Sequence, residues 1–85
     1  MERDLERTFA ANLVAYRMAR GMSQEALAHA VGVHRTYMQR LETAKQSATL
    51  RTVGSIADHL GVSPIDLLCP PKQPDMDDRL SGSFD

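Results

Sequence analysis

The sequence predicts a small all-α protein, a compact bundle of five helices. Two observations favour this fold class. Apolar residues recur every three or four positions, which is the spacing of one face of an α-helix, and no stretch alternates apolar and polar residues as a half-buried strand does. Glycine, serine, threonine and proline separate these periodic segments, at places where helices commonly begin or end. With 85 residues, the chain is long enough for one domain with a modest core.

The first two helices are predicted over residues 4–20 and 24–31. Gly21 ends the first helix, because glycine adopts a positive φ without a steric penalty. Ser23 caps the second helix with its hydroxyl group. The residues expected to face the core are Phe9, Leu13 and Tyr16 in the first helix and Leu27, Ala28 and Val31 in the second.

The third helix is expected within GVHRTYMQRLETAKQ, residues 32–46, after a tight turn at Gly32 and Val33. At about 100° per residue, Met38 and Leu41 fall on one side of this helix, which predicts that both are buried. The opposite side carries two guanidinium groups, one amide and one hydroxyl, but no carboxylate. Taken alone, such a side is more often a solvated helix surface than a binding site. Its residues are Arg35, Thr36, Gln39 and Arg40.

Two further helices complete the expected domain, which spans residues 1–71. Thr49 caps the fourth helix and Gly61 ends it. The fifth helix is short and opens at Ser63-Pro64-Ile65-Asp66, with a capping serine, a proline in the first turn and an acid three residues after the cap. Proline, aspartate, glycine and serine are frequent in residues 72–85, which predicts a disordered acidic tail. The residues expected to be buried by the fourth helix are Leu50, Val53, Ile56, Ala57 and Leu60.

Composition and charge limit the classes of function. The chain has no apolar run near 18 residues and begins with the charged stretch MERDLERTF, so we expect a cytoplasmic protein without a membrane partner. The single cysteine, Cys69, forms no internal disulfide, which agrees with a reducing compartment. The net charge is −1, but residues 35–51 hold four bases against Glu42 alone, while residues 72–85 hold two bases and four acids. Local positive charge of this kind permits a nucleic-acid partner.

No arrangement of residues predicts an enzyme, a metal site, a cofactor or a small-molecule ligand. Ser23 and Ser63 are explained as helix caps, because no general base with an orienting partner accompanies either hydroxyl. The possible metal ligands match no zinc-binding spacing. They are His29, His34, His59 and Cys69.

The second and third helices, within residues 24–41, fit a helix-turn-helix motif. Two helices joined by so short a turn must meet at a steep angle. Ala28 is small where the two backbones approach, and Gly32 supplies the positive φ of the turn. An ordinary helical hairpin also satisfies several of these positions. The apolar residues expected to hold the angle are Leu27, Val31, Val33, Met38 and Leu41.

A longer stretch of the sequence favours a helix-turn-helix over an ordinary helical hairpin. From Arg17 to Leu68 the sequence reads RMARGMSQEALAHAVGVHRTYMQRLETAKQSATLRTVGSIADHLGVSPIDLL. In order and spacing it resembles the Cro/lambda-repressor-type, or XRE-type, helix-turn-helix family. Members of this family show R-x-x-R-G-x-S-Q-E-x-L-A before the turn and a G-V-x-R-x-x-[hydrophobic]-x-x-[hydrophobic]-E recognition segment after it. The resemblance implies a lambda-repressor-like domain of five helices that binds double-stranded operator DNA, usually as a homodimer, with its third helix in the major groove.

Two residues depart from the family pattern, both in the loop after the third helix. Members commonly have glycine where this chain has Ala44, and proline where it has Ala48. Either the backbone at Ala44 adopts a positive φ, at a cost of roughly 1 kcal/mol, or the loop differs. Both departures concern the phosphate contacts of the loop and leave the predicted fold unchanged.

With the resemblance, the polar side of the third helix becomes a predicted DNA-reading surface. The arginine fork matches guanine, glutamine can pair with adenine, and the threonine methyl can meet that of thymine. The predicted base contacts are Arg35, Thr36, Gln39 and Arg40, of which Arg40 reaches a phosphate as readily as a base. The predicted contacts to the DNA backbone are Gln24, His34, Tyr37, Thr43, Lys45 and Gln46, although packing in the core explains Tyr37 equally well.

Two structural features are also expected. Family members that carry a pair equivalent to Arg17 and Glu42 join the first and third helices by an ion pair, which also keeps the carboxylate from repelling DNA phosphates. A dimer interface is predicted around the fifth helix, because its apolar residues exceed what so short a helix needs for its own core. The residues of this interface are Val62, Ile65, Leu67, Leu68 and Cys69.

We therefore interpret the chain as a DNA-binding transcriptional regulator, a dimeric repressor or autoregulator that reads an inverted-repeat operator. A phage or mobile-element repressor, a restriction–modification controller and an antitoxin-like autoregulator all fit the sequence. The alternative from another class is a protein-interaction module of the same fold, such as an antitoxin-like partner that reads no DNA. Such a module is expected to expose apolar residues on the outer side of the third helix, where this chain has polar ones.

Overall fold

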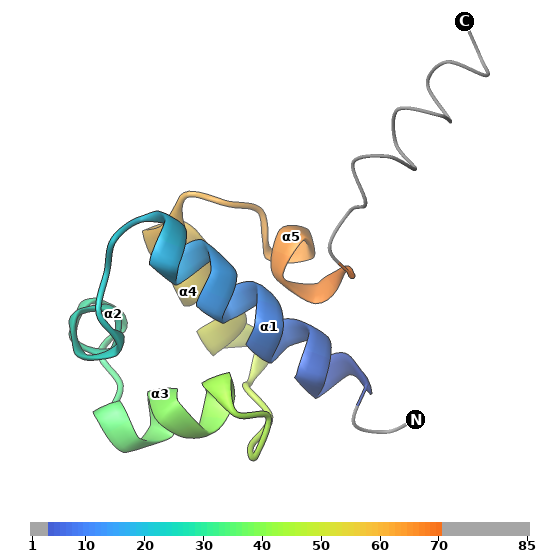
Figure 1. Cartoon of the computed structure of the whole chain (residues 1–85), viewed down its shortest axis with the longest axis horizontal. Helices are drawn as coiled ribbons and strands as arrows, with labels where there is room; N and C mark the ends of the chain where they lie inside the picture. The colour runs from blue at the N-terminus through green and yellow to red at the C-terminus, as the bar shows by residue number, and fades with distance from the viewer. Residues whose placement is uncertain (1–3, 71–85) are drawn as a thin grey trace, which may run out of the picture.

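The computed structural model describes residues 4–70, which form five α-helices and no strand (Figure 1). The predicted all-α class is therefore confirmed, with helix ends within a few residues of those expected. The tail predicted over residues 72–85 lies outside the described residues. The helices are α1 (Asp4–Ala19), α2 (Gln24–Val31), α3 (Arg35–Glu42), α4 (Leu50–Leu60) and α5 (Pro64–Leu68).

Side-chain caps and glycines fix the ends of these helices. As predicted, the hydroxyl groups of Ser23, Thr49 and Ser63 accept hydrogen bonds from backbone N–H groups in the first turns of α2, α4 and α5. Gly32 (φ 84°) and Gly61 (φ 71°) end α2 and α4 in the left-handed conformation. The turn at Gly32 directs the chain into α3 after only three residues.

The arrangement of the helices gives α3 one buried side and one free side. α1 packs against α3 and α5, α2 packs against α3 and α4, and α4 also packs against α5. In Figure 1, α2 is viewed nearly end-on while α3 runs across the page, so the two helices meet at the steep angle of a helix-turn-helix. The core between them contains the side chains of Phe9, Leu13, Leu27, Ala28, Met38, Leu41, Val53, Ile56, Ala57, Leu60 and Leu67.

One buried polar side chain joins the first and last helices. Asn12 is almost fully buried, and its Nδ2 donates hydrogen bonds to the carbonyl oxygens of Leu67 (2.9 Å) and Cys69 (2.7 Å). These carbonyls belong to the C-terminal end of α5, where a helix leaves its acceptors without intrahelical partners. Asn12 therefore anchors a helix of only five residues to α1.

The prediction that Leu50 is buried is wrong. Leu50 is 84% exposed, because it is the first residue of α4 and the core layer begins one turn later, at Val53. Leu50 instead lines an apolar groove of about 100 Å³ beside the N-terminal turns of α1. Tyr16 and Val31, also expected to be buried, are half-buried against the edge of the core. The other residues of the groove are Leu5, Glu6, Phe9, Ser47, Ala48, Val53 and Leu68.

Candidate nucleic-acid interface

α3 divides into a buried and an exposed side in the way that its sequence predicts. Met38 and Leu41 have no exposed surface. Tyr37 lies between the two sides, half-buried, with its ring packed against the core. The four residues predicted to contact bases are all exposed, and they are Arg35, Thr36, Gln39 and Arg40.

The first turn of α3 is capped by a histidine. His34 Nδ1 accepts a hydrogen bond from the Thr36 N–H at 3.0 Å, so this imidazole takes the place of the usual serine, threonine or asparagine. Because Nδ1 is the acceptor, the neutral ring carries its proton on Nε2. The predicted phosphate contact of His34 thus has a donor available, while the same side chain fixes the start of the helix.

The predicted pair of Arg17 and Glu42 is present and has further partners. Arg17 Nε lies 2.6 Å from Glu42 Oε2, and Arg17 Nη2 donates to Glu42 Oε1 at 3.1 Å. Arg17 Nη1 also donates to the carbonyl of Met22, in the segment that connects α1 and α2. Gln24 Nε2 donates to Glu42 Oε1 at 2.9 Å. The Glu42 carboxylate therefore links the end of α3 to α1 and α2, and Arg17 extends the network to the segment between α1 and α2.

This network determines the charge of the exposed side of α3. Glu42 is the only acidic residue of α3, and its side chain is 5% exposed. Two nitrogens of Arg17 and one of Gln24 surround its carboxylate, so its negative charge is compensated inside the protein. The charged side chains that remain exposed on α3 are Arg35 and Arg40, and both are cationic. An anion approaching this surface therefore meets attraction without a competing carboxylate.

The side chain of Gln24 thus already makes a hydrogen bond within the protein. It is the first residue of α2, where we predicted a contact to the DNA backbone, and its amide already donates one hydrogen bond to Glu42. A primary amide has a second N–H and a carbonyl oxygen. Gln24 can therefore support Glu42 and keep hydrogen-bonding capacity for a phosphate at the N-terminus of α2.

The loop after α3 has the backbone conformation usually made with glycine. Lys45 N–H donates to the Arg40 carbonyl at 2.9 Å and Ala44 N–H donates to the Leu41 carbonyl at 3.3 Å, which are the two bonds of a Schellman motif. Ala44, the residue that follows the C-cap of α3 in this motif, has a φ of 58°. Of the two possibilities left open by the sequence, a positive φ at Ala44 is therefore the observed one.

Replacing Ala44 with glycine is expected to stabilise the protein. The left-handed conformation brings the alanine Cβ too close to its own backbone, which costs about 1 kcal/mol relative to glycine. Ala44→Gly should therefore raise the free energy of unfolding by about 1 kcal/mol and the melting temperature by about 4–8 °C. Thermal unfolding followed by circular dichroism measures this. An unchanged or lower melting temperature would mean that Ala44 does not hold a strained left-handed conformation in solution.

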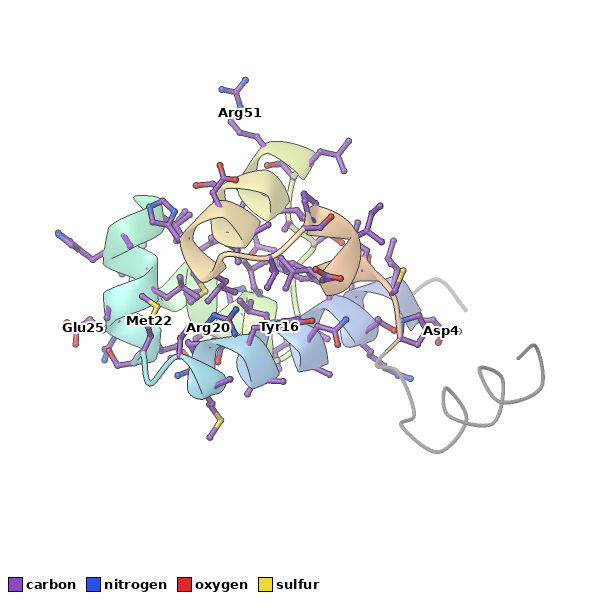
Figure 2. The ribbon with its side chains drawn as sticks, turned by 90° about the horizontal axis from the view of Figure 1, so that it is seen from above. Asp4, Tyr16, Arg20, Met22, Glu25 and Arg51 are labelled. Carbon is purple, nitrogen blue, oxygen red and sulfur yellow. The ribbon has the colours of Figure 1, made fainter. Side chains whose placement is uncertain are left out.

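Three residues of this loop are predicted to contact the DNA backbone, and they differ in whether their side chains are already hydrogen-bonded within the protein. The hydroxyl of Thr43 lies 3.0 Å from the Gln39 carbonyl and donates back into α3, so it must rotate before it can donate to a phosphate. Lys45 is exposed and needs no such change. Gln46 Oε1 accepts a hydrogen bond from Arg40 Nε at 3.1 Å. Arg51, the last of the four bases counted in residues 35–51, projects from the start of α4 away from the bundle (Figure 2).

The predicted dimer surface needs one correction. Leu67 has no exposed surface, because it is the single α5 residue that points into the core beneath Asn12, so it cannot contact a second chain. Ile65 is 66% exposed and Cys69 is exposed. Val62 and Leu68 are half-buried and keep part of their surface. Of the five predicted residues, four therefore remain accessible.

Comparison with known proteins identifies the family. A family model described as a helix-turn-helix domain matches residues 8–68, which includes all five helices apart from the first residues of α1. The chain belongs to this helix-turn-helix family. It is a DNA-binding regulator of the XRE type and not an enzyme. Among the residues that the structure describes, no helix is long and apolar enough to cross a membrane and no cluster of side chains could hold a metal ion.

The relatives of this helix-turn-helix protein are regulators. A hypothetical transcription factor from Neisseria meningitidis is 36% identical over 72 residues, covering 85% of this chain and 68% of the relative. The control protein C.SmaI from Serratia marcescens is 37% identical over 60 residues, which is 71% of each chain.

Solved structures agree with this family. The crystal structure of the Neisseria transcription factor matches with a TM-score of 0.78 at 34% identity, covering 95% of this chain and 87% of the other. The restriction–modification controller C.AhdI from Aeromonas hydrophila matches with a TM-score of 0.70 at 31% identity, covering 73% and 94%.

Sequence reasoning missed three contacts of this site. The cap by His34, the bond from Gln24 to Glu42 and the bond from Arg40 to Gln46 each depend on where a side chain ends, and helical periodicity does not specify that. A partial signal existed for one of them. Ala44 stands where the family has glycine, and a left-handed residue there is what returns the chain toward Arg40.

Proposed function

We propose that this protein is a sequence-specific transcriptional regulator that reads an inverted-repeat operator with α3 in the major groove. The observation that carries the proposal is the exposed side of α3. It presents two guanidinium groups, an amide and a hydroxyl, and the acid of the same helix is compensated by Arg17 and Gln24. These are the side-chain types that form hydrogen bonds to base edges in the major groove.

The distribution of exposed apolar residues supports this proposal over a protein-interaction module. The large hydrophobic residues exposed among residues 4–70 are Leu5, Met18, Leu50 and Ile65, and none of them is on α3. A surface that binds another protein through α3 is expected to have apolar residues at its centre. The α3 surface therefore suits a polyanion better than a protein partner.

The named relatives favour one of the three regulatory roles that fit the sequence. Two of the similar proteins, C.SmaI and C.AhdI, are named as a control protein and a restriction–modification controller. We therefore propose a controller-type autoregulator, which represses or adjusts transcription according to its own concentration. A phage-type repressor would bind DNA with the same surface.

Selection from a random pool of DNA duplexes tests the proposed function. The protein should enrich an inverted repeat whose half-sites are centred about one helical turn, or 34 Å, apart. Enrichment of no sequence, at a salt concentration near 0.1 M where non-specific contacts are weakened, would contradict sequence-specific reading.

We also propose that the protein works as a homodimer built around α5. One recognition helix reads only a few base pairs, and two-fold symmetry doubles that number. Ile65 and Leu68 are three residues apart on α5 and so share a side of it, and Leu68 also lines the groove with Leu5 and Leu50. Of the four large hydrophobic residues exposed among residues 4–70, Leu5 and Leu50 line this groove and Ile65 lies on the side of α5 that Leu68 shares. We propose that these three residues form one surface, with Val62 and Cys69 at its margin.

Substitutions on this surface should separate the dimer into monomers. Ile65→Asp and Leu50→Asp each place a charge where we expect apolar contact, and both residues are exposed enough that the fold should tolerate the change. Sedimentation at micromolar concentration should show a dimer for the unchanged protein and a monomer for either variant. Met18→Asp is the matched control, because Met18 is 65% exposed but lies about 20 Å along α1 from Leu5. A monomeric unchanged protein, or a dimer that withstands both substitutions, would contradict the proposal.

A further inference from the structure

The loop after α3 contacts one side chain of the exposed α3 surface. The left-handed turn at Ala44 reverses the chain direction, and Lys45 N–H donates to the Arg40 carbonyl. This reversal brings Gln46 beside Arg40, so that Arg40 Nε donates to Gln46 Oε1 at 3.1 Å. A guanidinium group has donors only, so the amide atom that faces it must be the oxygen.

The contact leaves a defined part of Arg40 for DNA. Gln46 takes the hydrogen on Nε, and the fork formed by Nη1 and Nη2 remains at the end of the side chain. That fork has the geometry of the two acceptors, N7 and O6, on guanine. A phosphate contact tolerates many arginine orientations, whereas a base contact requires one, so a fixed guanidinium matters chiefly for reading sequence.

We propose that Gln46 is a positioning residue, which holds the Arg40 guanidinium for a base contact. This proposal rests on the proposed function of α3 and goes beyond it by assigning Arg40 to a base rather than a phosphate, and Gln46 to Arg40 rather than to the DNA backbone. The long side chain of a free arginine loses rotamer freedom when it binds. A hydrogen bond formed in the unbound protein reduces that loss.

A double-mutant cycle with base preference as the readout tests the proposal. The protein and its Gln46→Ala, Arg40→Ala and doubly substituted variants are titrated with duplexes that differ at each base pair of one half-site. Gln46→Ala should lower the preference at the base pair read by Arg40 by about threefold to tenfold. In the Arg40→Ala background the same change should have no further effect. Because Gln46 is exposed, all variants should unfold near the temperature of the unchanged protein.

A conservative variant and a neighbouring residue complete the test. Gln46→Glu should keep the base preference, because a carboxylate also accepts from Arg40 Nε, although its charge should lower affinity for every duplex. Lys45→Ala should lower affinity without changing the preference at any base pair.

Two results overturn this proposal alone. Equal losses from Gln46→Ala with and without Arg40 would show that Gln46 contacts DNA by itself, and an unchanged preference would show that Arg40 needs no support. An unchanged protein that prefers no sequence would overturn the proposed function, and this proposal with it.

Discussion

Arg35→Ala should weaken binding to the selected operator by about 1–3 kcal/mol and relax the preference at one base pair of each half-site. Arg35 is the first residue of α3 and is exposed, and the N-terminal residues of a recognition helix are those that lie deepest in the major groove. A guanidinium fork on guanine contributes to discrimination between bases as well as to affinity. Fluorescence anisotropy with the operator and its single-base variants measures both quantities.

Lys45→Ala is the matched control for Arg35→Ala. Both changes remove one positive charge, but Lys45 lies in the loop beyond α3 and is predicted to contact a phosphate. Its loss should weaken every sequence to a similar extent and reduce the dependence of affinity on salt by about one counterion. If Arg35→Ala behaved in the same way as Lys45→Ala, Arg35 would be a phosphate contact and the register assigned to α3 would be wrong.

Arg17→Ala should give the largest loss of stability, about 2–4 kcal/mol, because it leaves Glu42 with its side chain 5% exposed and without its cation. Glu42→Ala should also destabilise the protein, since it removes the partner of both Arg17 and Gln24. The double variant should lose less than the sum of the single losses, by about 1–3 kcal/mol, because each single change removes the same contact. Chemical unfolding of all four proteins measures the cycle.

Arg20→Ala controls for the loss of an arginine at the end of α1. Arg20 is exposed, and its guanidinium lies over the Tyr16 ring at 5.4 Å from the ring centre (Figure 2). We expect its removal to cost no more than about 1 kcal/mol. Additive losses from Arg17→Ala and Glu42→Ala, or a loss from Arg20→Ala as large as that from Arg17→Ala, would contradict the structural role of the ion pair.

The sequence was sufficient to predict the helices and the two sides of α3. Apolar spacing determines which residues of a helix face the core, and Met38 and Leu41 are buried for that reason. Capping depends on a single side chain next to a helix end, so Ser23, Thr49 and Ser63 were also found from local sequence. Both kinds of signal are local, and a helical bundle with short loops depends mainly on local signals.

Contacts that depend on the relation between helices were not predictable. Leu50 has the right spacing for burial, but the core does not extend as far as the first turn of α4. From the sequence, Asn12 is one polar residue of an amphipathic helix. It is buried because the C-terminal end of α5 lies against it, and the local sequence does not specify that position. The contact of Arg40 with Gln46 depends on the left-handed conformation of Ala44, for which the family's glycine at this position was only a partial signal.

Locating the DNA on the protein tests most directly whether α3 is the surface that reads it. Amide chemical shifts of the isotope-labelled protein can be followed by NMR as the selected duplex is added. The largest changes should fall within residues 34–46 and at Gln24, where α2 begins beside the Glu42 network. Changes concentrated at Leu5, Leu50 and Ile65, or spread evenly over the surface, would show that α3 does not read the DNA.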